Sequence, residues 1–140
     1  MVIREFKVIV DGTLDAPAIK TMTPISFWGG VNTEDGVVQD VHNELHGESL
    51  AGKVLCMPFD KGSCSGSGTV FEMIYRSTNP AGMLCLEASP VLALGPIIGE
   101  RIYERKMPIR VISKEALEQI HSGDHIRFTE DAIIIEPSQA

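Results

Sequence analysis

The stretch that decides the fold is Lys53–Thr78, "KVLCMPFDKGSCSGSGTVFEMIYRST". Its first seven residues form an apolar run typical of a buried strand. Its second half repeats apolar residues with helical spacing, so that Val70, Met73 and Ile74 share one face. Between the two, Asp60–Gly68 holds three serines, three glycines and one cysteine. The stretch therefore predicts a strand, a loop of small residues and a helix in direct succession.

The flanking chain predicts a mixed α/β domain in which strands outnumber helices. A short helix is expected in "KEALEQIHSG" and a closing hairpin in "DHIRFTEDAIIIEP". The segment "SPVLALGPIIGERIYE" predicts a helix that is interrupted at Gly95–Pro96, because proline removes a backbone donor. No repeat or low-complexity segment divides the chain, so residues 1–140 are predicted to form a single domain.

Composition excludes several classes of function. The chain has 140 residues and a net charge of −7, from 12 basic and 19 acidic residues, and the basic residues are scattered. Nucleic acids and anionic membranes are disfavoured as partners, because each requires a cluster of basic side chains. No apolar run reaches the roughly 20 residues of a membrane span, and the N-terminus does not resemble a signal peptide. We expect a cytoplasmic protein.

The cysteines agree with that location. Cys56, Cys64 and Cys85 are an odd number without close pairing, which argues against a disulfide framework and for a reducing compartment. Their spacing does not match a metal motif either. No metal or cofactor is therefore expected to be held by this chain alone.

Two nucleotide-binding motifs can be compared with the loop, and neither fits. A Walker loop requires the lysine after the glycines, at the start of the helix, whereas Lys61 precedes them. A dinucleotide fingerprint requires glycines spaced two and then three apart. Gly62, Gly66 and Gly68 are spaced four and then two apart.

A cysteine nucleophile is a second hypothesis for the loop. A helix N-terminus lowers the pKa of a thiol, which would activate Cys64. The thiol would also need a base, and His42, His46, His121 and His125 are the available histidines. The alternative is a half-buried thiol without a chemical role.

Anion binding is a third hypothesis. The first turn of a helix has free N–H donors and a partial positive charge, which suit a carboxylate or a phosphate. Glycines let a ligand approach the backbone, and serines add donors. An ordinary N-cap and turn would use one serine, whereas this loop has three. The composition therefore favours a loop that faces a ligand.

Four motifs in order indicate a family. The segments "PISFWGGV", "LHGESLAGKVLCMP", "KGSCSGSG" and "SPVLALGPIIGE" resemble the small subunit of aconitase X, the swivelling domain of the aconitase superfamily. The resemblance covers nearly the whole chain and implies a β-rich β/β/α domain. One departure is Asn43–Glu44, where the family tends to carry His-Pro.

The resemblance also implies a mechanism with two subunits. A large subunit would hold an iron or iron–sulfur centre, and the small domain would close over a small carboxylate substrate. Aconitase-type swivelling domains carry a Gly-Ser-Ser-Arg loop whose first serine removes a proton alpha to a carboxylate. By this match Ser63 would be the catalytic base, and Gly62, Cys64 and Ser65 would bind substrate. Ser65 stands where the family has the arginine that binds carboxylate, which implies a substrate with fewer carboxylates.

Two activities are known in this family, cis-3-hydroxy-L-proline dehydratase in bacteria and mevalonate-5-phosphate dehydratase in archaea. The loop "GSCSGSG" is similar to the bacterial form, so the proline reaction is favoured and the mevalonate reaction is the alternative. A non-catalytic ligand-binding module and a stand-alone thiol hydrolase using Cys64 remain competing hypotheses. Under the hypothesis of two subunits, Trp28 of "PISFWGGV" is expected to be an anchor residue in the interface with the large subunit.

Overall fold

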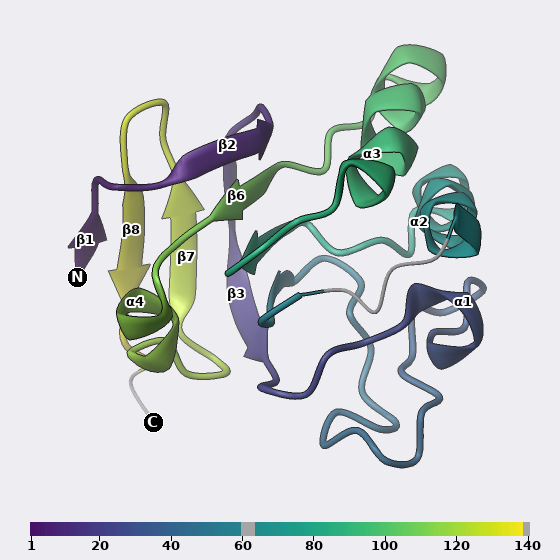
Figure 1. The fold of residues 1–140 in the computed structure, drawn as a ribbon, viewed down its shortest axis with the longest axis horizontal. Helices are drawn as coiled ribbons and strands as arrows, with labels where there is room; N and C mark the ends of the chain where they lie inside the picture. Colours follow the sequence, from purple (N-terminus) through teal and green to yellow (C-terminus); the bar gives the residue numbers. More distant parts are fainter. Residues whose placement is uncertain (60–63, 139–140) are drawn as a thin grey trace.

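The protein is built on one mixed sheet of eight strands (Figure 1). The computed structural model describes residues 1–59 and 64–138 and, in the helix that begins at Cys64, the side chains from Gly66 onward. The strand order is β1-β8-β7-β3-β4-β5-β6-β2. The strands are β1 (Val2–Ile3), β2 (Lys7–Val10), β3 (Leu14–Lys20), β4 (Val54–Cys56), β5 (Gly82–Cys85), β6 (Ile109–Val111), β7 (His125–Phe128) and β8 (Ile133–Glu136).

The four central strands, β3 to β6, run parallel, and the outer strands pair antiparallel to their neighbours. Parallel strands need crossover connections, and helices supply two of the three here. The helices are α1 (Phe27–Gly30), α2 (Cys64–Arg76), α3 (Pro90–Tyr103) and α4 (Lys114–Glu118). All four parallel strands therefore end at the same edge of the sheet, where the loops that lead into the helices gather.

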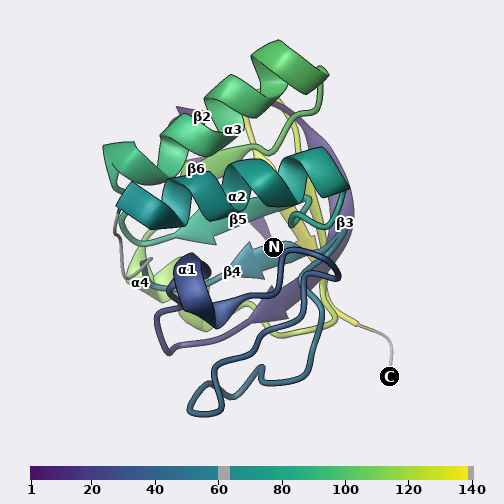
Figure 2. The ribbon, with the colours of Figure 1, turned by 90° about the vertical axis from the view of Figure 1, so that its right-hand side faces the viewer.

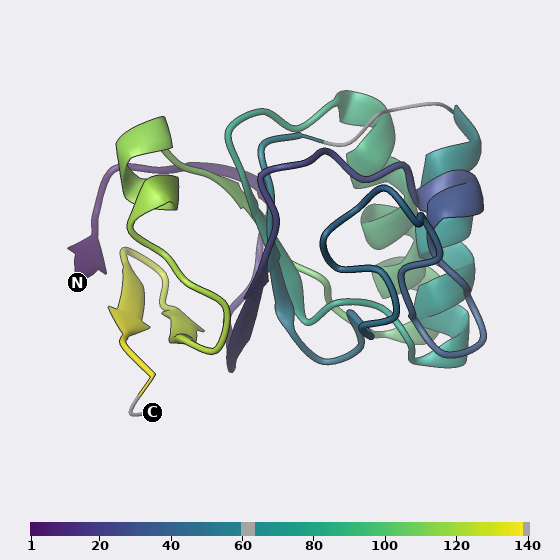
Figure 3. The same cartoon turned by 90° about the horizontal axis from the view of Figure 1, so that it is seen from below.

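The sheet is curled, because β1 and β2 are consecutive in the chain but lie at its opposite edges. The result is three layers, visible in Figures 1 and 3. Helices α1, α2 and α3 cover one face of the parallel strands. On the other face lie β1, β7 and β8 together with α4. This is the β/β/α arrangement expected from the sequence.

Alternating side chains divide the interior into two cores. On β4, Leu55 points to the core under α2 and α3, whereas Val54 and Cys56 point to the core between the β layers. On β5, Met83 and Leu84 divide in the same way. A strand that is buried on both faces reads as a continuous apolar run, which explains why "KVLCMP" shows no polar alternation.

Among the described residues, Arg110 of β6 is a cation that is buried in the core between the β layers. Its guanidinium carbon lies 4.5 Å from the ring centroids of both Phe6 and Phe128. The guanidinium donates to the carbonyl oxygens of Gly12, Thr129 and Ala132, at 3.3, 2.6 and 3.1 Å. Its Nε has no hydrogen-bond partner among the described residues. Arg110 thus connects β6 to the turn before β3 and to the turn between β7 and β8.

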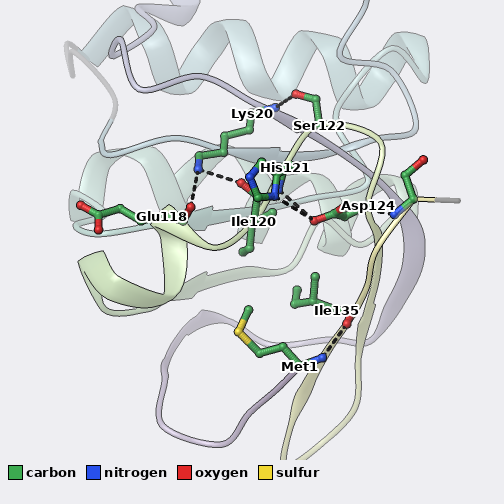
Figure 4. Close-up of polar contacts among 9 residues, drawn as sticks. Met1, Lys20, Glu118, Ile120, His121, Ser122, Asp124 and Ile135 are labelled. Carbon is green, nitrogen blue, oxygen red and sulfur yellow. Dashed lines mark hydrogen bonds and ion pairs between the residues drawn. The ribbon is translucent and has the colours of Figure 1, made fainter. Parts of the chain in front are cut away.

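Lys20, the last residue of β3, fixes the end of α4 (Figure 4). Its ammonium donates to the carbonyl oxygen of Ile120 at 2.7 Å and to that of Glu118 at 3.5 Å. Its backbone N–H donates to the hydroxyl of Ser122 at 2.9 Å. A cation at a helix C-terminus is favourable, because the last carbonyl groups of a helix carry a partial negative charge.

Three details differ from the sequence-based expectation. The sequence "IREFKVIV" at residues 3–10 alternates as one strand does, but the structure divides it into β1 and β2, which join different edges of the sheet. The helical spacing around Val70 predicts that the helix starts near Gly66–Val70, whereas α2 starts at Cys64. Helix α3 is continuous through Pro96, so the predicted interruption was wrong. Pro96 is buried inside α3, and Gly95 and Gly99 on either side of it pack against α2.

Candidate functional site

The candidate site lies at the edge of the sheet where the parallel strands end. Gly62 and Ser63 lie outside the described residues, so the description covers the segments on either side of them. Cys64 and Ser65 are the first two residues of α2. The predicted strand is confirmed as β4 and the predicted helix as α2, whereas the loop predicted between them falls partly on residues 60–63, which lie outside the described residues.

The segment before the loop is fixed to the neighbouring connection. Met57 donates its N–H to the carbonyl oxygen of Leu84 at 3.0 Å, which extends the β4–β5 pairing by one step. The carbonyl oxygen of Pro58 then accepts from the backbone N–H groups of Leu86 and Glu87, at 2.9 and 3.2 Å. Met57 and Pro58 are thus both held by backbone hydrogen bonds to β5 and to the residues that follow it.

The segment after the loop is fixed by the packing of α2 on α3. A Cβ on Gly95 would lie 2.6 Å from the carbonyl oxygen of Ser67, and a Cβ on Gly99 would lie 3.0 Å from the side chain of Ile74. Only glycine allows this close approach of the two helices. Figure 2 shows α2 and α3 side by side on the sheet, with α1 next to α2.

The start of α2 has features that suit an anion. Its sequence begins Cys64-Ser65-Gly66 and has no acidic residue in the first turn, where Asp and Glu are usually favoured. The contrast is α4, whose N-cap Ser113 accepts from the N–H of Ala116 and whose first turn contains Glu115. Helix α4 is capped in the ordinary way, whereas the positive end of α2 has no counter-charge of its own in that turn.

Two glycines of α2 have no packing function. A Cβ on Gly66 or on Gly68 would meet nothing within 4 Å, and neither residue has a positive φ. A helical glycine costs about 1 kcal/mol relative to alanine. Among the described residues, nothing packs closely enough against Gly66 or Gly68 to require a glycine there.

The histidines considered as bases for Cys64 lie elsewhere. His125 is ion-paired with Asp15 across β7 and β3, and His121 lies 3.9 Å from Asp124. His125 belongs to β7, which the sheet separates from α2 (Figure 1), and His121 lies in the turn between α4 and β7. His42 and His46 are exposed on the long connection between α1 and β4. The side chain of Cys64 lies outside the described part of the structure, so the cysteine nucleophile stays a hypothesis.

The remaining cysteines do not suit a metal. Cys56 and Cys85 are fully buried in the core, and burial raises the pKa of the Cys56 thiol far above its ordinary value. Metals bind the thiolate, so a thiol held neutral is a poor ligand. Within the described residues, no group of three metal-ligating side chains comes together.

No described helix is long and apolar enough to cross a membrane.

A surface feature that the sequence analysis missed is an apolar cavity between α2 and α3. It has a volume of about 210 Å³ and is lined by Ser67, Gly68 and Phe71 of α2 and by Gly95 and Ile98 of α3. The ten uncharged residues that begin α3 could have indicated it, because a surface helix normally has one polar face.

The three layers and the four central parallel strands define a mixed α/β domain, with the candidate site residues next to the start of α2. The chain belongs to the aconitase X swivel domain family, whose model matches residues 4–136. It is similar to the phosphomevalonate dehydratase small subunit of Thermococcus kodakarensis, with 36% identity over 128 residues, which cover 91% of this chain and 90% of that protein. It is also similar to the cis-3-hydroxy-L-proline dehydratase of Pseudomonas aeruginosa, with 35% identity over 108 residues, which cover 77% of this chain and 19% of that protein.

The solved structures agree with the family. The crystal structure of Thermococcus kodakaraensis aconitase X in its holo-form matches with a TM-score of 0.83 and 28% identity, over 94% of this chain and 95% of that chain. The chain spans about a fifth of the length of the hydroxyproline dehydratases that it matches. In those proteins the swivelling domain is thus one part of a much longer polypeptide.

Proposed function

We propose that this chain is the small subunit of an iron-dependent, aconitase-type dehydratase, active only together with a large subunit. The observation that supports it most is the family match over residues 4–136. The first turn of α2, which has no acidic residue, agrees with it. The names of the relatives, two kinds of dehydratase, point to the same reaction class.

In this proposal Ser63 removes the proton alpha to the substrate carboxylate. A serine hydroxyl becomes a base only if its alkoxide is stabilised, and the free N–H groups of the first turn of α2 would do that. Gly62, Cys64 and Ser65 would shape the carboxylate pocket. The proton passes from carbon to the Ser63 oxygen, and the hydroxide leaves from the neighbouring carbon to give the alkene or enamine.

The iron centre is assigned to the large subunit. The two described cysteines, Cys56 and Cys85, are buried in the core and do not suit a metal. Bound in the large subunit, iron would supply a Lewis acid for the leaving hydroxide. This chain's own part is to position the base and to close the site from water.

The favoured substrate is cis-3-hydroxy-L-proline, which loses water to give pyrroline-2-carboxylate. The residues of the loop, "GSCSGSG", support this choice, since the bacterial form of the family loop is similar. The alternative substrate is mevalonate 5-phosphate. It is supported by the match to the Thermococcus kodakarensis small subunit, which extends over 90% of that protein.

The test is made on this chain copurified with its large subunit. Dehydration of each substrate is measured together with solvent-deuterium exchange at the alpha carbon, which follows proton removal alone. Ser63→Ala should leave assembly intact and lower both rates at least about 100-fold, as expected for a lost general base. Cys64→Ala and Ser65→Ala should be milder and raise KM.

Ser113→Ala is the matched control. It removes a serine from the start of α4 and should leave both rates unchanged. If Ser63→Ala exchanges the proton at the wild-type rate while Cys64→Ala does not, the base is misassigned. Turnover by this chain without a large subunit would overturn the two-subunit proposal and favour the thiol hydrolase.

A further inference from the structure

The outer face of α3 is apolar, although it is open to solvent. Leu94, Ile97, Ile98 and Ile102 are 44–59% exposed, and they recur at the spacing of one helix face. The opposite face of α3 is buried on α2 and the sheet. A helix that is apolar all round is normally covered on both sides. Its outer face therefore lacks a partner in this chain.

The uncharged region extends across the cavity onto α2. In the sequence of α2 the first charged residue is Glu72, and in that of α3 it is Glu100. The first eight residues of α2 and the first ten of α3 thus carry no charge, in a protein whose charged content is 22%. Depletion of charge around an apolar centre is the composition of a protein interface core.

We infer that the N-terminal halves of α2 and α3 form the docking surface for the large catalytic subunit, which inserts an apolar side chain into the cavity lined by Gly68, Phe71 and Ile98. This inference rests on the proposed function and adds a partner surface to it. We call this surface the α2–α3 groove, and define it by Ser67, Gly68, Phe71, Leu94, Gly95, Ile97 and Ile98.

Position supports the large subunit as occupant. Ser67 lies about 5 Å along the axis of α2 from Cys64, at 1.5 Å per residue. A subunit that brings its substrate to the loop before Cys64 must therefore lie against the groove. The hydroxyproline dehydratases support this too, because four fifths of their length lies outside the matched domain and is available to cover it.

Other occupants fit less well. A second copy of this chain on the α2–α3 groove would cover the start of α2, which the proposed reaction needs for the large subunit. A small acidic substrate would find no cation there, because the cavity is lined by Ser67, Gly68, Phe71, Gly95 and Ile98. The cavity suits one aliphatic or aromatic side chain.

The test uses substitutions that the isolated chain tolerates. Gly68→Leu places a side chain where a Cβ meets nothing within 4 Å, so the domain should fold and the cavity should be filled. Ile98→Glu places a charge in the groove at a residue that is 44% exposed. Affinity for the large subunit of the same organism is measured by calorimetry, and the fold by circular dichroism. Each variant should bind at least about 100-fold more weakly, the loss seen at interface hot spots.

Val41→Glu is the matched control, since Val41 is 69% exposed on the connection between α1 and β4. It should bind as the wild type does. At saturating large subunit, Gly68→Leu should recover the wild-type turnover, whereas Ser63→Ala should not. This difference separates a docking defect from a catalytic one.

The remaining outcomes overturn one proposal or the other. Wild-type affinity in both groove variants, or equal weakening by Val41→Glu, would overturn the docking surface and leave the proposed function intact. Self-association of the isolated wild-type chain that Gly68→Leu abolishes would make a second copy the occupant. Failure of the wild-type chain to bind the large subunit at all would overturn the proposed function.

Discussion

Gly95 of α3 lies so close to Ser67 of α2 that a Cβ on the glycine would be 2.6 Å from the serine carbonyl oxygen. The nitrogen of Phe71 would be 3.2 Å away. Both neighbours are backbone atoms, which cannot move without moving the helix. The first two turns of α2 are therefore positioned by a glycine 28 residues beyond Ser67 in the chain.

We expect Gly95→Ala to push the two helices apart. Overpacking of this kind lowers the free energy of unfolding by about 1–3 kcal/mol. Gly68→Ala is the control: it lies in the same helix pair with open space around it, and should raise the free energy of unfolding by about 0.5–1 kcal/mol. Urea denaturation of both variants measures the difference. If Gly95→Ala and Gly68→Ala have equal free energies of unfolding, α2 and α3 can separate without destabilising the fold, and the prediction is wrong.

A second prediction concerns Arg110, which donates to three carbonyl groups between the β layers. Arg110→Met should lower the free energy of unfolding by about 2–4 kcal/mol, because several buried acceptors lose their donor. Arg127→Met, at an exposed arginine of β7, should stay within about 0.5 kcal/mol of wild type. If the two variants have the same free energy of unfolding, water has replaced Arg110 as the donor to the three carbonyl groups, and the prediction is wrong.

A third prediction concerns pH. The carboxylate of Glu44 accepts from the hydroxyl of Thr21 and, at 2.9 Å, from the N–H of Met22. These hydrogen bonds, the Thr21 one first, lower the pKa of Glu44. A lowered carboxyl pKa stabilises the fold above the ordinary value of about 4.3, and the contribution is lost as pH falls through the folded-state pKa.

We therefore expect the amide resonance of Met22 to shift and to exchange faster with solvent in acid, below about pH 4.3. In Glu44→Gln this transition should disappear. Glu48→Gln, an exposed glutamate of the same connection, should retain it. NMR titration of the three proteins makes the comparison. A Met22 transition that survives in Glu44→Gln would assign it to another carboxyl group.

A fourth prediction concerns the thiols. Cys56 and Cys85 are fully buried, and burial raises the pKa of Cys56, so neither should react in the folded protein. A colorimetric thiol reagent at pH 8 should label at most one cysteine per native chain and all three in denaturant. Labelling of two or more in the native state would contradict the packing of the core. Because the pKa of Cys56 is raised, its contribution to stability is lost as pH rises above about 8.5.

A fifth prediction concerns Trp28, which is 64% exposed on α1. Trp28→Ala should leave the free energy of unfolding within about 0.5 kcal/mol of wild type. It should weaken copurification with the large subunit, since exposed aromatic residues are frequent interface anchors. Phe27→Ala is the contrast, because Phe27 is 2% exposed and its loss should destabilise the fold by about 3–5 kcal/mol. Unchanged assembly in Trp28→Ala would remove α1 from the interface.

The sequence predicted the fold where local pattern and tertiary structure agree. The strand before the Ser63 loop and the helix after it were predicted because buried runs and helical spacing are local properties. The course of α3 through Pro96 was not predicted, because it depends on Gly95 and Gly99 packing against a helix far away in sequence. The division of the N-terminal segment into β1 and β2 was missed for a similar reason, since it follows from closure of the sheet.

The position of the candidate site could be predicted from the sequence, whereas the groove beside it could not. Its position at the start of α2 followed from the strand-loop-helix order, and the structure adds that Gly66 and Gly68 are free of packing contacts. The role of Ser63 stays a prediction, because that residue lies outside the described part of the chain. The α2–α3 groove could not be derived from spacing alone, because it needs the relative placement of Phe71 and Ile98.

The pairing of the first and last strands bears on how this chain is synthesised. The amino group of Met1 donates to the carbonyl oxygen of Ile135, 134 positions away, and Val2 pairs with Ile134. Contacts of such long range form slowly, because the intervening chain must first be ordered. On the ribosome the inner core stays open until β8 has left the exit tunnel. We expect the nascent chain to depend on chaperones until then, and to aggregate when translation stops before Ile133.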